Sequence, residues 1–337
     1  MRRKSLRLAA AAAALTAAVV AAAGASTSSG ARESSAAAFK VAVLLPGSTS
    51  DQGYNADGQR SANLIKKALK ADVTVTQSVS VPNQADVYRQ YAAKGYNLVI
   101  GWGGQFTSGA VTVASEFPNV QFLVVNSNAK NGSNLSSFDT KIEDWEFLGG
   151  FVAAKLSKNG NVGWVGGQCF PATAANLHGF EQGARFASSR VKVQRTFTGD
   201  FEDPTKAQQA AQAMIDNGAT ALSGNLNNGW FGIFKAAKSN KNLPVVTEWT
   251  DNHKLAPTVI ASSILKSQAS FVLGLAKKAQ AGTLGGKFYL FGLPKSWGPG
   301  ISKTNLLPAS VYRQALAVQK KIASGALKPK HDESCPK

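Results

Sequence analysis

Short apolar runs alternate with stretches of helical period along this chain. Residues 41–45 are apolar and partly β-branched and are followed by Pro46 and Gly47, which is typical of a buried strand that ends in a turn. Comparable runs occur at residues 72–79, 97–101, 120–125, 161–167, 191–197, 219–223 and 243–247. Because helical patterns separate these runs, the alternation predicts doubly wound parallel sheets of the α/β class.

The alternation stops near residue 126 and starts again near residue 145, which predicts two similar α/β lobes. A hinge would join them, and a cleft would form where their strand ends face each other. We expect the first lobe at residues 39–141 plus 251–286, and the second at 142–250 plus 287–327, followed by a tail at 328–337. Within this arrangement residues 258–280 return to the first lobe, whereas a strand at 287–293 and a helix at 308–324 rejoin the second.

The N-terminal residues have the pattern of a secretory signal. Four basic residues within the first seven positions precede an Ala-rich apolar segment, and the small residues at 23–26 suit signal peptidase. The apolar segment is short for a membrane anchor, which needs about 20 residues. We expect residues 1–25 to be a signal peptide and residues 26–38 a flexible tether. The protein would be exported to the periplasm or cell envelope, without a lipobox cysteine, and Arg2-Arg3 leaves Sec and Tat export both open.

The formal net charge of the whole chain is +18 at pH 7. Residues 1–25 hold four basic and no acidic residues, so their removal lowers the charge by four, to +14. The remaining basic residues occur in ones and twos, without a block of like charge or a DNA-binding motif. This spacing indicates a solvated basic surface and no nucleic-acid partner.

The chain has two cysteines, Cys169 and Cys335. In an exported protein they can form one disulfide bond, which would pin the C-terminal tail to the second lobe. The Cα spacing cannot be derived from the sequence, so the pairing stays open. Two cysteines and three dispersed histidines do not suggest a metal site.

Enzymatic motifs are missing from the sequence. There is no Gly-x-Ser-x-Gly elbow, and residues 101–104 lack the spacing of a dinucleotide fingerprint. We therefore expect a protein that is not an enzyme and needs neither a cofactor nor a metal. Carboxylates such as Asp51 and Asp57 leave an envelope hydrolase as an alternative.

Polar and aromatic side chains follow several predicted strands. Asp51, Tyr54 and Asn55 come after the first strand, and Trp102 comes after the third. In open α/β sheets ligands bind beyond the carboxyl ends of the strands. An aromatic face beside short polar side chains suits a flat, polar small molecule. Core packing remains the alternative for Trp102.

The second half offers similar candidates at its strand ends. Asn225, Trp249 and Asp251 follow predicted strands, as does Phe170 in the segment QCFP. For Trp249 the alternative is packing, and for Asn225 and Asp251 it is capping of a turn.

A series of short motifs runs through the chain in a recognisable order. These are DQGYN at 51–55, GWG at 101–103, FPNVQFLVVN at 117–126, FLGGFVA at 147–153, GWVGG at 163–167, GF and GAR within 179–185, and FEDPTKA at 201–207. Together they resemble the basic membrane protein (BMP) family of ABC-transporter solute-binding proteins, which have a type I periplasmic-binding-protein fold. The resemblance covers nearly all of the chain beyond the signal peptide.

The resemblance implies capture of a purine or nucleoside, with the base held between aromatic rings of opposite lobes. Tyr54 lies at the position of the first-lobe aromatic, and Phe201 is a possible second-lobe counterpart. Lys266 lies near a lysine that contacts ribose in nucleoside-binding members. Asn55 matches a polar position, and Asp251 belongs to an element that resembles a Ser-Asp pair of purine-binding members.

Three positions depart from the family pattern. Asn126 replaces an Asp of many members, Trp249 occupies a position that is acidic in nucleoside binders, and Ala56 replaces a residue that is often acidic or an amide. Ribose diols are usually gripped by carboxylates, so these departures leave the choice between base and nucleoside open. The expected ligand-binding residues are Asp51, Tyr54, Asn55, Trp102, Asn126, Phe170, Phe201, Asn225, Trp249, Asp251 and Lys266.

The resemblance also implies a mechanism and partners. A monomer would close its hinge around a small molecule, and an ABC permease would bind the closed state. Besides the envelope hydrolase, a ligand-sensing protein of the same fold without a transport role stays open.

Overall fold

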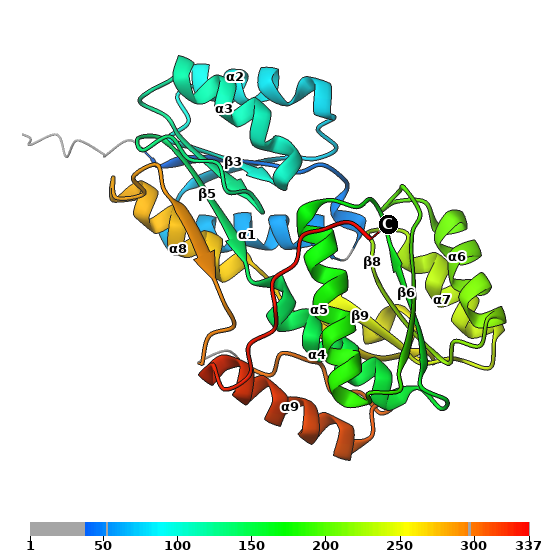
Figure 1. Cartoon of the computed structure of the whole chain (residues 1–337). Coiled ribbons are helices and arrows are strands. Elements are labelled where there is room, and N and C mark those ends of the chain that lie inside the picture. Colours follow the sequence, from blue (N-terminus) through cyan, green and yellow to red (C-terminus); the bar gives the residue numbers. More distant parts are fainter. Residues whose placement is uncertain (1–37, 52, 296–297, 337) are drawn as a thin grey trace, which may run out of the picture. The chain divides into compact units, whose positions relative to one another are not determined.

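The computed structural model describes residues 38–51, 53–295 and 298–336 (Figure 1). The signal peptide and nearly all of the tether that the sequence predicts lie outside these residues. The described chain forms two sheets in which every strand pairing is parallel. The predicted class of two doubly wound parallel sheets is therefore confirmed.

The first sheet has the strand order β11-β5-β4-β3-β1-β2. Its strands are β1 (Lys40–Leu44), β2 (Asp72–Thr76), β3 (Leu98–Trp102), β4 (Gln121–Val125), β5 (Leu135–Thr140) and β11 (Phe288–Phe291). Successive side chains of a strand point to opposite faces, so Val41 and Val43 enter one core whereas Ala42 and Leu44 enter another. The first core includes helices α1 (Tyr54–Leu69) and α8 (Ala269–Gln280), and the second includes α2 (Gln84–Ala93) and α3 (Thr107–Glu116). Helices therefore cover both faces of this sheet.

The second sheet has the order β10-β9-β8-β6-β7. Its strands are β6 (Asn161–Gly166), β7 (Lys192–Phe197), β8 (Ala221–Asn225), β9 (Val245–Trp249) and β10 (Ile260–Leu265). One face packs on α4 (Ile142–Leu156), α5 (Pro171–Ala187) and α9 (Ala309–Ser324), and the other on α6 (Pro204–Asp216) and α7 (Trp230–Ser239). Short 3₁₀ helices complete the described chain: η1 (Thr49–Asp51), η2 (Val81–Asn83), η3 (Gly104–Phe106) and η4 (His253–Leu255).

The chain crosses between the sheets at places that differ from the sequence-based expectation. Residues 258–280 do not return together: β10 pairs with β9 in the second sheet, and only α8 packs on α1 of the first (Figure 1). The strand expected at 287–293 in the second lobe pairs with β5 of the first sheet instead. The ring of Phe291 in β11 stacks on Phe271 of α8 at 4.5 Å between centroids, a contact that no local pattern reveals. Helix α9 joins the second lobe as expected, against α4.

Strand β5 was absent from the prediction because its sequence, LSSFDT, is mostly polar. The hydroxyls are used inside the structure: Ser137 donates to the carbonyl oxygen of Ala129 at 2.6 Å, and Ser136 accepts from the backbone N–H of Lys287 at 3.2 Å. Satisfied hydroxyls can be buried at little cost, so the strand needs no apolar run.

A disulfide bond joins Cys169 and Cys335, which are 166 residues apart in sequence. The pairing that the sequence left open is thus present, and it ties residues 328–336 to the second lobe. In the described part of the chain, no helix has both the length and the apolar character that crossing a membrane requires.

Candidate functional site

Asp51 organises the loop between β1 and α1. Its carboxylate accepts hydrogen bonds from the backbone N–H groups of Gly53 at 3.0 Å, Asn55 at 2.7 Å and Ala56 at 3.0 Å. It also accepts from the side chain of Asn55, whose Oδ1 accepts from Gly47 N–H at 2.9 Å. These bonds satisfy N–H groups that a helix start leaves without partners. Asp51 and Asn55 are buried and already bonded, so they hold the loop that presents Tyr54.

Tyr54 begins α1 and points its hydroxyl at the first sheet. The hydroxyl donates to Asn126 Oδ1 at 2.9 Å, and Asn126 Nδ2 donates to Asp139 Oδ1 at 2.9 Å. Burial, and after it the carboxylates of Asp139, Asp57 and Asp51, raise the pKa of Tyr54 well above its usual value. The phenol therefore stays protonated at physiological pH and acts as a hydrogen-bond donor.

The Tyr54 ring lies in contact with two tryptophans. Trp102, at the end of β3, is fully buried with its centroid 5.9 Å from that of Tyr54. Trp249, at the end of β9 in the second sheet, lies 5.1 Å away with the planes inclined by 57°. Trp249 has a φ of 76°, in the left-handed region that a bulky residue rarely adopts. The structure thus brings three of the predicted residues together, two from the first sheet and one from the second.

A second contact brings the strand-end loops of the two sheets together. A Cβ built on Gly47, in the loop after β1, would lie 3.2 Å from the Glu202 carboxylate in the loop after β7. Glu202 accepts hydrogen bonds from the side chains of Asn227 at 2.6 Å and Asn228 at 2.8 Å, both in the loop after β8. Loops after β1, β7, β8 and β9 therefore meet, as the prediction of facing strand ends requires.

Lys266 lies behind Trp249 rather than open to a ligand. Its ammonium is paired with the carboxylates of Glu146 and Glu248, and all three side chains are at most 1% exposed. The Nζ atom is 4.5 Å from the centroid of the Trp249 ring, which is close enough for a cation–π interaction. Glu248 also accepts from Asn225 at 2.8 Å. Lys266 and Asn225 thus form a buried polar cluster that supports Trp249 from the second lobe.

The protonation of this cluster follows from its burial. Burial raises the pKa of Glu146 to about 8, with Lys266 opposing the shift and Glu248 adding to it. Near neutral pH Glu146 is therefore mainly protonated, so the Lys266 ammonium lies beside an uncharged carboxyl group. A protonated carboxyl group is far less costly to bury than an additional negative charge.

The sequence prediction missed Glu146 and Glu248. Each is followed or preceded by apolar residues, Glu146 in WEFLGGF of α4 and Glu248 in VVTEW of β9. Because isolated charged residues are almost never buried without a partner, these segments contained the signal for a buried ion pair. The partner, Lys266, lies 120 residues from Glu146, and only the fold identifies it.

Phe170 and Phe201 form a second aromatic pair at the end of the second sheet. Their centroids are 6.3 Å apart and their planes are inclined by 19°, which is a stacked arrangement. Phe170 is 46% exposed, so one face of the pair is open to solvent. Asp251 is also exposed, and it accepts from the backbone N–H of His253 at 3.2 Å. That bond matches the turn-capping alternative for Asp251.

No group of three or more His, Cys, Asp or Glu side chains that could hold a metal ion occurs among the residues that the structure describes. The chemistry of the site is that of aromatic rings, amides and internally bonded carboxylates.

Two parallel sheets whose carboxyl-end loops meet, with aromatic rings from both sides, define a periplasmic-binding-protein-like solute-binding protein. The sequence model of the family described as ABC transporter substrate-binding protein PnrA-like, or Bmp, matches residues 38–332. The chain therefore belongs to this family, and the resemblance to basic membrane proteins is confirmed. The family consists of solute-binding proteins and not of enzymes, and such proteins act outside the cytoplasm.

Individual relatives agree with this assignment. Basic membrane protein D of Borreliella burgdorferi (strain JD1) is 26% identical over 302 residues, which cover 87% of this chain and 88% of the relative. A purine-binding protein of Brucella abortus (strain 2308) is 24% identical over 293 residues, covering 86% and 82%. Among solved structures, an ABC transporter solute-binding protein from Conexibacter woesei is 26% identical with a TM-score of 0.68, covering 87% of this chain and 99% of that one.

Proposed function

We propose that this protein captures a purine or nucleoside outside the cytoplasm, closes around it and delivers it to an ABC permease. The observation that carries the proposal is the contact between Tyr54 and Trp249, with 5.1 Å between ring centroids. The rings come from strand-end loops of different sheets, so a flat ligand could lie between them when the sheets separate. Stacking on aromatic rings is favourable for any heteroaromatic base.

The polar groups of the site favour an uncharged ligand. Asp51 is bonded to backbone N–H groups, and the Lys266 ammonium donates hydrogen bonds to Glu146 and Glu248. A charged ligand would have to break these pairings to find a counter-ion. The hydroxyl of Tyr54 and the amide of Asn126, 2.9 Å apart, can exchange their mutual bond for bonds to ring nitrogens or exocyclic groups. The name of the Brucella relative supports a purine.

Hinge closure is supported by the way the chain passes between the sheets. Three segments make the passage, from β5 to α4, from β10 to α8 and from β11 to α9. Two of them are joined by a backbone bond from Lys141 N–H to Phe291 O at 2.8 Å. The third is bonded to α1, where Asp57 accepts from Gln268 N–H at 2.7 Å and from the Ser267 hydroxyl. Short connections of this kind allow two lobes to rotate as rigid bodies.

The test is a thermal-shift screen with adenine, guanine, hypoxanthine, uracil and their nucleosides, and with sugars and amino acids as controls. A compound that binds the native state at 100 times its dissociation constant adds ~2.7 kcal/mol to the free energy of unfolding. We expect Tyr54→Ala to abolish the shift. Tyr289→Ala is the matched control, because it truncates another partly buried tyrosine that packs on the same core, in the edge strand β11.

Each outcome of the screen has a distinct meaning. A larger shift with free bases than with nucleosides would indicate that the carboxylates replaced here by Asn126 and Trp249 are needed to hold ribose. Shifts with sugars or amino acids alone would overturn the purine assignment and keep the binding class. If a base binds but fails to stimulate the ATPase of a reconstituted permease, that result would favour a ligand-sensing protein without a transport role. Turnover of the base would favour an envelope hydrolase.

A further inference from the structure

The C-terminal residues form an extended segment that lies along α5. We call residues 328–336 the C-terminal strap; they contain neither helix nor strand (Figure 1). Gln182 of α5 binds the strap twice, since its side chain donates to Lys330 O at 2.8 Å and accepts from Lys330 N–H at 2.7 Å. A paired side-chain and backbone contact of this kind fixes one point of the strap in register with the helix.

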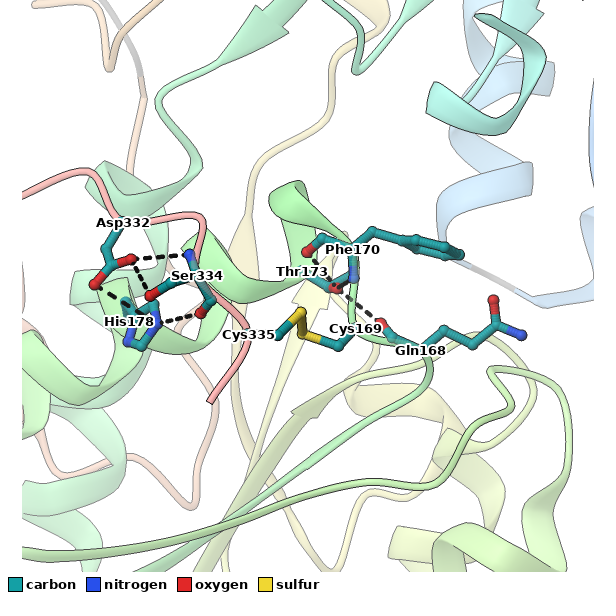
Figure 2. The surroundings of a disulfide bond; sticks show 8 residues. All are labelled: Gln168, Cys169, Phe170, Thr173, His178, Asp332, Ser334 and Cys335. Atoms are coloured by element: carbon teal, nitrogen blue, oxygen red, sulfur yellow. Dashed lines mark hydrogen bonds and ion pairs between the residues drawn. A yellow bond between two sulfur atoms is a disulfide. The ribbon is translucent and has the colours of Figure 1, made fainter. Parts of the chain in front are cut away.

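A second anchor lies one turn earlier on the same helix. The His178 ring is 2.9 Å from Ser334 O and 3.8 Å from the Asp332 carboxylate, and Asp332 accepts from Ser334 N–H at 2.9 Å (Figure 2). His331 approaches Glu143 of α4 at 3.3 Å. The strap is thus held by polar contacts to both α4 and α5 before it reaches Cys335.

The strap ends at the disulfide bond to Cys169, with the two Cα atoms 6.0 Å apart. Cys169 lies in the four-residue loop between β6 and α5, flanked by Gln168 and Phe170. Hydrogen bonds hold the residues on either side of Cys169: Gly167 N–H donates to Asn225 O at 3.1 Å, Gln168 Nε2 donates to Gly199 O at 3.1 Å, and Phe170 N–H donates to the Thr173 hydroxyl oxygen at 2.8 Å. The covalent bond to Cys335 is therefore the strongest restraint on Cys169.

Phe170 follows Cys169 directly and points away from the strap. Figure 2 shows the Phe170 ring and the strap residues on opposite sides of the disulfide. The ring is stacked on Phe201, 6.3 Å between centroids, in the loop that also carries Glu202. Because Phe170 is 46% exposed, packing alone does not hold it in place.

We propose that the C-terminal strap is a positioning element of the ligand site: through Cys169 it holds Phe170 against Phe201, and thereby sets the affinity for the bound base. Cys169, Cys335 and Gln182 are its positioning residues. This inference rests on the proposed function, because it assumes that the Phe170–Phe201 pair borders the bound molecule.

A double-mutant cycle on binding tests the proposal, with adenine and adenosine as probes in titration calorimetry. In Cys169→Ser/Cys335→Ser we expect about five- to tenfold weaker binding, the range that loss of one aromatic contact gives. Phe170→Ala should weaken binding by a similar factor. The triple variant should bind no more weakly than Phe170→Ala, because the strap acts through that ring. If the two serine substitutions weaken binding by the same factor in the wild type and in Phe170→Ala, the strap acts on general stability and not through the Phe170 ring. That result would overturn the proposal.

Gln182→Ala gives a second variant that keeps the disulfide and removes one anchor, with Gln212→Ala of α6 as its matched control. Gln182→Ala should weaken binding of the probes measurably, whereas Gln212→Ala should leave it unchanged. If both glutamine variants bind like the wild type and the serine variant does too, the strap has no positioning role.

Hydrogen exchange separates this proposal from the ligand assignment. In the ligand-free protein, amides of residues 167–173 should exchange at least about tenfold faster in Cys169→Ser/Cys335→Ser than in the wild type, because local opening becomes easier. Unchanged exchange there would overturn the proposal even if purines bind. Faster exchange in a protein that binds neither probe would support the strap as a restraint on Phe170 and overturn the purine assignment alone.

Discussion

At the scale of single residues, polar side chains near the site serve mainly to hold other groups. Asp51 binds three backbone N–H groups of the loop that presents Tyr54. The sequence placed Asp51 at this loop, because a polar, turn-rich stretch follows a strand, but its side chain could equally have faced a ligand. Only the structure shows that its oxygens are already occupied.

Glu146 gives a prediction on pH. Its pKa of about 8 in the folded state exceeds the ordinary value of 4.5, so the folded protein binds this proton more tightly than the unfolded chain does. The contribution of this proton to the free energy of unfolding is fully present below the pKa of Glu146 in the unfolded chain, and it is lost as the pH rises towards the folded value of about 8. We expect the free energy of unfolding to fall between pH 6 and 8, by at most ~1.4 kcal/mol per pH unit.

The matched variant for this measurement is Glu146→Gln, which cannot titrate but keeps a donor and an acceptor. The window starts at pH 6 because the half-buried Asp139 and Asp144 have pKa values raised to about 6, chiefly by loss of solvent around their carboxylates. Urea unfolding at several pH values should show a shallower decline for the variant. Parallel curves for the two proteins would rule out Glu146 as the titrating group.

At the scale of elements, the glycines in two motifs of the family resemblance have a packing role. A Cβ on Gly150 of α4 would lie 1.8 Å from Phe180 O, and one on Gly183 of α5 would lie 1.9 Å from Phe147 O. Backbone atoms cannot move aside as side chains can, so the two helices pack closely only because these positions lack side chains. The motifs are visible in the sequence, whereas the packing role of their glycines becomes apparent only from the close contact of α4 and α5.

Gly150→Ala should therefore destabilise the protein by at least about 3 kcal/mol, the upper range for overpacked cores. Gly274→Ala of α8 is the control, since no atom lies within 4 Å of a Cβ built there. That change should stabilise the protein by about 0.5–1 kcal/mol through helix propensity. Urea unfolding measures both, and similar midpoints for the two variants would contradict the close packing of α4 and α5.

At the scale of the whole molecule, the arrangement of segments decides which surfaces can meet. Strand β11 completes the first sheet and α9 covers the second, although they are neighbours in sequence. Strand β11 has the short apolar sequence FYLF, which could have joined either sheet. The stacking of Phe291 on Phe271 and the pairing of β11 with β5 select the first sheet for the strand.

Hinge closure predicts a change that small-angle scattering can detect. Saturating adenine or adenosine, whichever raises the melting temperature, should lower the radius of gyration of the protein. Tyr54→Ala at the same concentration should show no change, because it loses the ring on which the base would stack. A ligand-bound radius equal to the ligand-free one would contradict closure and leave binding by a rigid site.

The sequence by itself determined the class of fold and the loop that carries Tyr54. Strands and helices differ in the spacing of the apolar residues that face the core. That spacing is visible within a short stretch of sequence. The tertiary structure alone decided the partners of Lys266, the sheet that β11 joins and the contact of the strap with α5. These depend on which of many distant segments offers a compensating charge, a free strand edge or a matching ring. Several of these interactions join residues far apart in the sequence, such as Lys266 and Glu146 at 120 positions or Gln182 and Lys330 at 148, so no local pattern specifies them.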